Sequence, residues 1–201
     1  MQLRIAMENL PRLVHFESPV SEADFEALCR ENGILRFERT REGAIRVNPP
    51  AGGWTSSGNA EIAKQLTNWQ SQHKCGRVFD SSGGFRLPDG SILSPDAAYL
   101  SPERLQTLPK GGLRGFPKIC PDFVIELLSE SDTLSALQEK MLDWMSNGAQ
   151  LGWLIDPYIR QVFIYRPDKA AECFTGARLA GEGPATGFSL DLARVWERYQ
   201  D

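Results

Sequence analysis

The segment PDFVIELLS (121–129) constrains the fold most, because its apolar run predicts a β-strand that is covered on both faces. Only Glu126 interrupts the run after it begins. An ionised carboxylate that is buried without a partner costs several kcal/mol at least, so this acid should be ion-paired, protonated or bound to a metal. A structural ion pair or a strand edge that faces water would also explain it. The strand therefore predicts a buried sheet that carries one unusual acid.

The pattern on both sides of this strand predicts an α/β (α+β) fold with a mixed central β-sheet, flanking helices and additional β-hairpins. We see no internal repeat and no linker between two cores, so we expect one domain over residues 1–201 with a core at about 20–196. Helical spacing of apolar residues or strand-like runs predict the individual elements. Helices are expected at 21–32, from 59 to about 73–76, at 132–147 and at 191–200; strands at 91–100, at 121–129 and near 177–180; hairpins at 34–50 and 151–167; and loops at 51–58 and 101–120.

Composition limits the kinds of metal site and the cellular location. No apolar run approaches the roughly 18 residues that span a bilayer, and the first residues lack a signal peptide's continuous apolar stretch, so we expect a cytoplasmic protein without membrane contact. The four cysteines are scattered with no CxxC pair, and His15 and His73 are the only histidines. A metal would therefore be held mainly by carboxylate and carbonyl oxygens, which favours Mg²⁺ or Mn²⁺. No organic cofactor is expected.

Asp96 is a second acid that enters an apolar stretch. It follows Pro95 and precedes Ala97–Leu100, so it should lie at the mouth of a buried strand, although a role as a turn cap is the simpler alternative. Neighbouring strands lie about 4.8 Å apart, so Asp96 and Glu126 can converge on one point. Two carboxylates that close repel each other unless they share a proton or a cation. The pair therefore predicts a divalent metal site.

Three further polar residues are candidates for the same site. Lys140 lies at the border of the apolar stripe of its helix, where a lysine can bury its stem and direct its ammonium at the sheet, or simply face solvent. Gln138 falls nearer that stripe and is a possible pocket residue. Glu61 precedes Ile62 early in its helix, where an acid is also favourable at the positive end of the helix dipole.

The chain resembles the PD-(D/E)xK nucleases, the restriction-endonuclease-like superfamily. The closer resemblance is to its large bacterial family of uncharacterised proteins described as putative restriction endonucleases. Several segments carry the resemblance in order along most of the chain: NAEIAKQL, GFRLPDGSILSPDAAYLSPERL, PDFVIELLSESD, the run from Lys140 through Trp144 to Gly148, GWLIDP and VFIYRP.

The resemblance implies a role for each matching position. Asp96 corresponds to the first acid and a metal ligand, Glu126 to the second acid, and the carbonyl of Leu127 to a further ligand. Glu61 corresponds to the acid that many members carry on a helix. One position departs from the motif, because Leu128 replaces the expected lysine; the family supplies that lysine from the next helix, where Lys140 stands.

The implied activity is metal-dependent hydrolysis of phosphodiester bonds in DNA by an endonuclease of the hydrolase class. The loop at 101–120 is the expected DNA contact because it carries four cations against one acid, although these charges could equally be solvated surface. The four cations are Arg104, Lys110, Arg114 and Lys118. Relatives with this fold often act as dimers, so the resemblance also implies a homodimer.

Two other classes of function remain open. The first is a non-catalytic module of the same fold that binds nucleic acid or a protein, which Leu128 in the lysine position and the formal charge of −4 support. The second is a metal-dependent hydrolase that acts on a substrate other than nucleic acid. Stoichiometric metal binding that depends on Asp96 and Glu126 separates the enzymes from the module.

Overall fold

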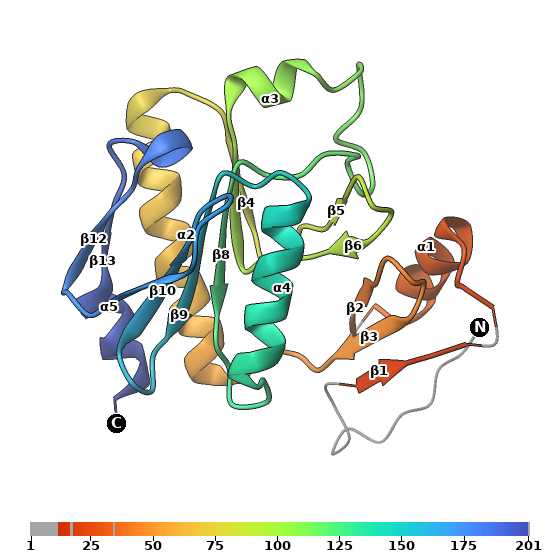
Figure 1. Ribbon diagram of the computed structural model, residues 1–201, viewed down its shortest axis with the longest axis horizontal. Coiled ribbons are helices and arrows are strands. Elements are labelled where there is room, and N and C mark those ends of the chain that lie inside the picture. The colour runs from red at the N-terminus through yellow and green to blue at the C-terminus, as the bar shows by residue number, and fades with distance from the viewer. Residues whose placement is uncertain (1–11, 17, 34, 201) are drawn as a thin grey trace.

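A six-stranded mixed sheet forms the centre of the computed structural model, which describes residues 12–16, 18–33 and 35–200 (Figure 1). Its strand order is β11-β10-β9-β8-β7-β4, and only β8 and β9 are parallel neighbours. The mixed central sheet predicted from the sequence is therefore confirmed. The strands are β4 (Arg77–Asp80), β7 (Ala97–Leu100), β8 (Phe123–Leu127), β9 (Leu151–Asp156), β10 (Gln161–Tyr165) and β11 (Glu172–Phe174).

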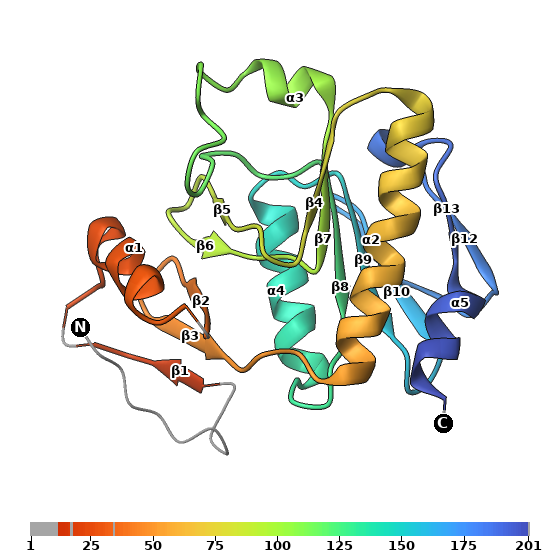
Figure 2. The same cartoon turned by 180° about the vertical axis from the view of Figure 1, so that it is seen from behind.

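Two helices cover opposite faces of this sheet, as both views show (Figures 1 and 2). Helix α2 (Gly53–His73) packs with Phe123, Ile125 and Leu127 in one apolar core, and helix α4 (Leu134–Ser146) packs with Val124 in another. Because side chains alternate along a strand, Glu126 points to the α4 face. All five residues of β8 are buried, which agrees with the uninterrupted apolar pattern.

A second sheet of five strands lies beside the central one, in the order β1-β3-β2-β6-β5 (Figure 1). The hairpin expected at 34–50 is present, and α1 packs on it through Phe25 and Leu28. The elements are β1 (Arg12–Val14), α1 (Glu22–Glu31), β2 (Arg36–Arg39), β3 (Ile45–Asn48), β5 (Phe85–Arg86) and β6 (Ile92–Leu93). Ser21 caps α1, as its sequence indicates, by accepting a hydrogen bond from the amide of Asp24 at 3.2 Å.

The C-terminal part packs against the α2 side of the central sheet. A two-stranded sheet forms there, and Leu192, Val195 and Trp196 join the core that α2 closes. The elements are β12 (Arg178–Ala180), the 3₁₀ turn η2 (Gly183–Ala185), β13 (Ser189–Asp191), α5 (Leu192–Trp196) and the 3₁₀ turn η3 (Glu197–Tyr199). No helix of the described residues is both long and apolar enough to cross a bilayer. The single-domain organisation stays a prediction.

Three sequence-based expectations about the elements are corrected. The segment 91–100 is two strands in different sheets, because Pro95 lacks the backbone N–H that a continuous ladder requires. Residues 53–58 are the first turns of α2 rather than a loop, since packing of Thr55 and Gly58 outweighs weak helix propensity. The connection 101–120 contains the short helix α3 (Pro102–Gln106), which Ser101 caps.

Candidate active site

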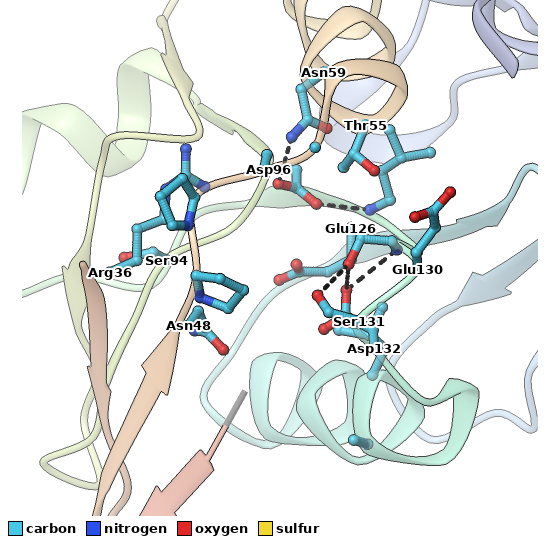
Figure 3. A pocket seen from close by; sticks show the side chains of 18 of the residues that line it. Arg36, Asn48, Thr55, Asn59, Ser94, Asp96, Glu126, Glu130, Ser131 and Asp132 are labelled. Carbon is cyan, nitrogen blue, oxygen red and sulfur yellow. Dashed lines mark hydrogen bonds between the residues drawn. The ribbon is translucent and has the colours of Figure 1, made fainter. Parts of the chain in front are cut away.

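A cavity of about 990 Å³ lies between the two sheets. It is bordered by the β2–β3 hairpin, the first turns of α2, the end of β8 and the first half of α4 (Figure 3). Asp96, Glu126 and Lys140 all line it, although 44 positions separate the first from the last. Leu127 lines it too, so the fold brings four of the sequence-predicted site residues to one place.

Asp96 stands directly before β7 at the cavity wall. Strands β7 and β8 pair with Ala97 opposite Ile125, so Asp96 is placed opposite Glu126 at the next step. Its Oδ2 accepts a hydrogen bond from the Leu127 amide at 2.8 Å, and its Oδ1 accepts one from Asn59 Nδ2 at 2.8 Å (Figure 3). Removal from water raises the pKa of Asp96 despite these donors and the nearby Lys140 charge.

Glu126 is 2% exposed and is held by two donors from α4. Its Oε1 accepts from Trp144 Nε1 at 2.8 Å and lies 3.0 Å from Lys140 Nζ, while its Oε2 lies 3.1 Å from the same ammonium. Burial raises the pKa of Glu126 to about 8, and the neighbouring charges of Asp96 and Glu38 add to the effect of burial against the opposing Lys140 charge. A cation in the cavity would favour the ionised form of this carboxylate.

Lys140 on α4 places its ammonium beside Glu126. Leu128 packs in the α4-side core, whereas Lys140 Nζ reaches Glu126, the Ser94 carbonyl at 2.8 Å and Glu38 Oε1 at 2.8 Å. Burial lowers the pKa of Lys140, but the surrounding carboxylates outweigh burial and raise it overall. The side chain is therefore a buried cation that lies between Glu38 and Glu126.

Glu38 is a site residue that the sequence analysis did not identify. It lies on β2, where alternation with Phe37 predicts exposure, yet both residues are buried. Burial raises the pKa of Glu38, but Lys140 and Arg46 outweigh burial and lower it overall. The only sequence signal is an acid within a short hairpin strand, which does not distinguish a buried position from a solvated one.

Asn59 is a second residue that sequence reasoning missed. It is buried in α2 two residues before Glu61, donates to Asp96, and its Oδ1 has no hydrogen-bond partner among the described residues. Gly58 allows this approach, since a Cβ there would lie 2.8 Å from Leu127 Cδ2. An unsatisfied buried acceptor costs about 1–3 kcal/mol. A donor brought by a ligand in the cavity, such as the water of a hydrated cation, would satisfy it.

The donors at the site fit Mg²⁺ or Mn²⁺. Asp96 and Glu126 offer carboxylate oxygens at the cavity wall, and Mg²⁺ commonly binds through one or two carboxylates while it keeps several waters. Within the described ranges no group of three or more His, Cys, Asp or Glu side chains is arranged to hold a metal. A cation here would therefore take its remaining ligands from water, substrate or the main chain.

Glu61 and Gln138 do not line the cavity, and the roles that the sequence gives them stay predictions. Glu61 faces the C-terminal part, where its Oε2 lies 3.2 Å from both Lys64 Nζ and Arg198 Nη2. One helical turn is 3.6 residues, so a residue two positions from Asn59 points to the other side of α2. Gln138 is half-buried next to Leu137, and α4 presents Leu137 and Lys140 to the cavity instead.

The cations of the 101–120 connection do not line the cavity either. The connection joins the end of β7 to the start of β8, whereas Asp96 and Glu126 lie at the opposite ends of these strands. Arg104 is committed to the fold, since its guanidinium bonds the Cys120 carbonyl at 2.6 Å and lies 3.0 Å from Asp122 Oδ1. The DNA contacts expected of Arg104 and of the exposed cations Lys110, Arg114 and Lys118 stay predictions.

Comparison with known proteins agrees with this fold. A crystal structure from Anabaena variabilis ATCC 29413, described as that of a putative nuclease belonging to DUF820, matches with a TM-score of 0.70 and 23% identity. The match covers 82% of this chain and 91% of that one, and it shows that the two share a fold. No curated protein matches the chain. The model of the Uma2 family, described as "Putative restriction endonuclease", matches residues 22–193, and the chain belongs to this family.

Proposed function

We propose that the protein is a divalent-metal-dependent endonuclease that hydrolyses phosphodiester bonds in DNA. The observation that carries the proposal is the pair of Asp96, directly before β7, and Glu126, on the adjacent strand β8. They lie at one wall of the cavity, with the Lys140 ammonium 3.0 Å from Glu126. The descriptions of the family and of the Anabaena neighbour support the same class of reaction.

Each residue has a distinct role in this proposal. Asp96 and Glu126 would hold Mg²⁺ or Mn²⁺, and the Leu127 carbonyl is a further candidate ligand. When bound, the cation supplies Lewis-acid chemistry and lowers the pKa of water. Lys140 stabilises the charge that develops on the phosphate, since a fixed cation away from bulk water acts strongly on nearby charge. Trp144 holds Glu126 Oε1 in place through its 2.8 Å hydrogen bond.

Arg36 and Arg46 are the proposed phosphate contacts at the cavity, in addition to the cations predicted in the 101–120 connection. Both line the cavity from the β2–β3 hairpin. The binding constant falls as salt rises, and each phosphate contact contributes roughly one unit to the slope of log binding constant against log salt. Replacing both arginines by glutamine should therefore reduce the magnitude of this slope by about 2. Fluorescence anisotropy of labelled DNA in Ca²⁺ measures this slope. A second variant with Lys110 and Arg114 replaced tests the loop in the same assay. An unchanged slope in the Arg36 and Arg46 variant would mean that these two arginines do not contact phosphate.

The test of the proposed function is nicking of supercoiled plasmid DNA by the purified chain. We expect conversion to open-circular and linear forms in Mg²⁺ or Mn²⁺, no conversion in EDTA, and much slower conversion by Asp96→Asn and Lys140→Met. Linear product formed without a nicked intermediate would support the predicted homodimer. Nicking at the wild-type rate in both variants would reject the site.

A non-catalytic binding module is the second candidate, and one observation favours it. Lys140 already neutralises Glu126, so this carboxylate is satisfied without a metal. The module predicts a folded protein that binds DNA in EDTA as well as in Mn²⁺ and takes up no stoichiometric metal. The endonuclease predicts metal uptake that requires Asp96.

A further inference from the structure

Glu38 is a buried carboxylate that reaches the site from the second sheet. It is 3% exposed, and its Oε1 accepts a hydrogen bond from the Ser94 amide at 3.0 Å and lies 2.8 Å from Lys140 Nζ. Its Oε2 lies 3.8 Å from Arg46 Nη1. The two close contacts are therefore both made by Oε1, whereas Oε2 has only the Arg46 guanidinium at ion-pair distance.

The Lys140 ammonium has three N–H donors, and three groups surround it. These are Glu38 Oε1 at 2.8 Å, the Ser94 carbonyl at 2.8 Å and Glu126 at 3.0 Å. In the proposed reaction Glu126 would also hold a divalent cation, and the ammonium of Lys140 would then share this carboxylate with a second positive charge. Glu38 and the Ser94 carbonyl would then be the two acceptors of the Lys140 ammonium that are not also metal ligands.

We propose that Glu38 is the positioning residue of Lys140: it keeps the ammonium beside the reacting phosphate while Glu126 holds the metal. This role rests on the proposed endonuclease function. Because Glu38 lies on β2, the five-stranded sheet would contribute a functional residue to the active site in addition to bordering the cavity. The proposal differs from a third-ligand role, in which Glu38 itself would bind the cation, and the two make opposite predictions for metal affinity.

The experiment compares Glu38→Gln with Glu42→Gln, the same substitution at an exposed acid in the turn of the same hairpin. Plasmid or oligonucleotide cleavage at saturating Mn²⁺ gives kcat and KM, and calorimetric titration gives the Mn²⁺ affinity. We expect Glu38→Gln to lower kcat by about 10- to 100-fold, as misplacement of a catalytic group does, with KM and Mn²⁺ affinity within about twofold of wild type. Glu42→Gln should match wild type in all three.

A double variant separates positioning from general damage. If Glu38 acts through Lys140, then Glu38→Gln combined with Lys140→Met should cleave no more slowly than Lys140→Met alone. Glu38→Asp, which keeps the charge on a shorter side chain, should recover part of the rate and serves if the glutamine variant does not fold.

Four results would overturn the role. An unchanged kcat in Glu38→Gln, a fully additive double variant, or an aspartate variant no faster than the glutamine variant would each reject positioning, and a loss of Mn²⁺ affinity as large as that of Asp96→Asn would make Glu38 a ligand. A wild-type chain that cuts no DNA under any condition would instead overturn the proposed function, and this role with it.

Discussion

Replacing Asp96 by asparagine is expected to lower the rate of DNA cleavage by about 10³-fold or more. The change removes one of the two carboxylates proposed to bind the metal. A bound cation stabilises the transition state by several kcal/mol, and a loss of about 4 kcal/mol corresponds to a 10³-fold lower rate. Asparagine has the same shape, and its carbonyl can still accept from either Asn59 or the Leu127 amide. Single-turnover cleavage of a labelled duplex in Mg²⁺ measures the effect.

Glu61→Gln is the matched control for this variant. It neutralises the other acid that the sequence motif suggested, but its carboxylate contacts Lys64, Gln65 and Arg198 outside the cavity. We expect its cleavage rate to stay within about threefold of wild type, a change of less than 1 kcal/mol in activation free energy. If Glu61→Gln lost as much activity as Asp96→Asn, Glu61 would be a catalytic residue despite its place outside the cavity.

Replacing Lys140 by methionine is expected to lower the free energy of unfolding by roughly 3–5 kcal/mol without added metal. Methionine keeps the apolar stem but leaves Glu38 and Glu126 buried together without their shared cation. Saturating Mg²⁺ should restore part of the loss by binding the native state, about 2.7 kcal/mol at 100 times the dissociation constant. Urea denaturation followed by circular dichroism, with and without Mg²⁺, measures both effects.

Lys64→Met provides the comparison for a surface ion pair. Lys64 lies 3.2 Å from Glu61, but its side chain is 54% exposed. Such pairs contribute about 0–1 kcal/mol, so the expected loss is small and independent of Mg²⁺. Equal losses in the two lysine variants would mean that Lys140 is an ordinary helix residue and not the cation that neutralises the site.

The sequence predicted the parts of the fold that depend on local pattern. The apolar run of β8 identified the central strand, and the acid inside it identified Glu126 as unusual before any neighbour was known. The helical period placed Lys140 at the edge of the apolar face of α4, and the structure brings its ammonium to Glu126. The apolar run of a buried strand and the apolar period of a helix are visible within a few residues, so a single segment is enough to indicate them.

The features that the sequence did not predict depend on contacts between distant segments. Glu38 is buried because the second sheet lies against the cavity, whereas the alternation within β2 indicates an exposed position. The first turns of α2 are helical because Thr55 and Asn59 pack beside the end of β8, against weak local propensity. Arg104 looked like a free cation because its acceptors, the Cys120 and Gly148 carbonyls, are 16 and 44 residues away.

Calorimetric titration of the wild-type chain and the Asp96→Asn variant with Mn²⁺ tests most directly whether Asp96 and Glu126 form a divalent-metal site. We predict saturable binding to the wild type, with at least one equivalent per chain, and loss of one equivalent in the variant while its circular dichroism spectrum stays that of the folded protein. Absence of binding to the wild type, or the same isotherm for both proteins, would contradict the metal site.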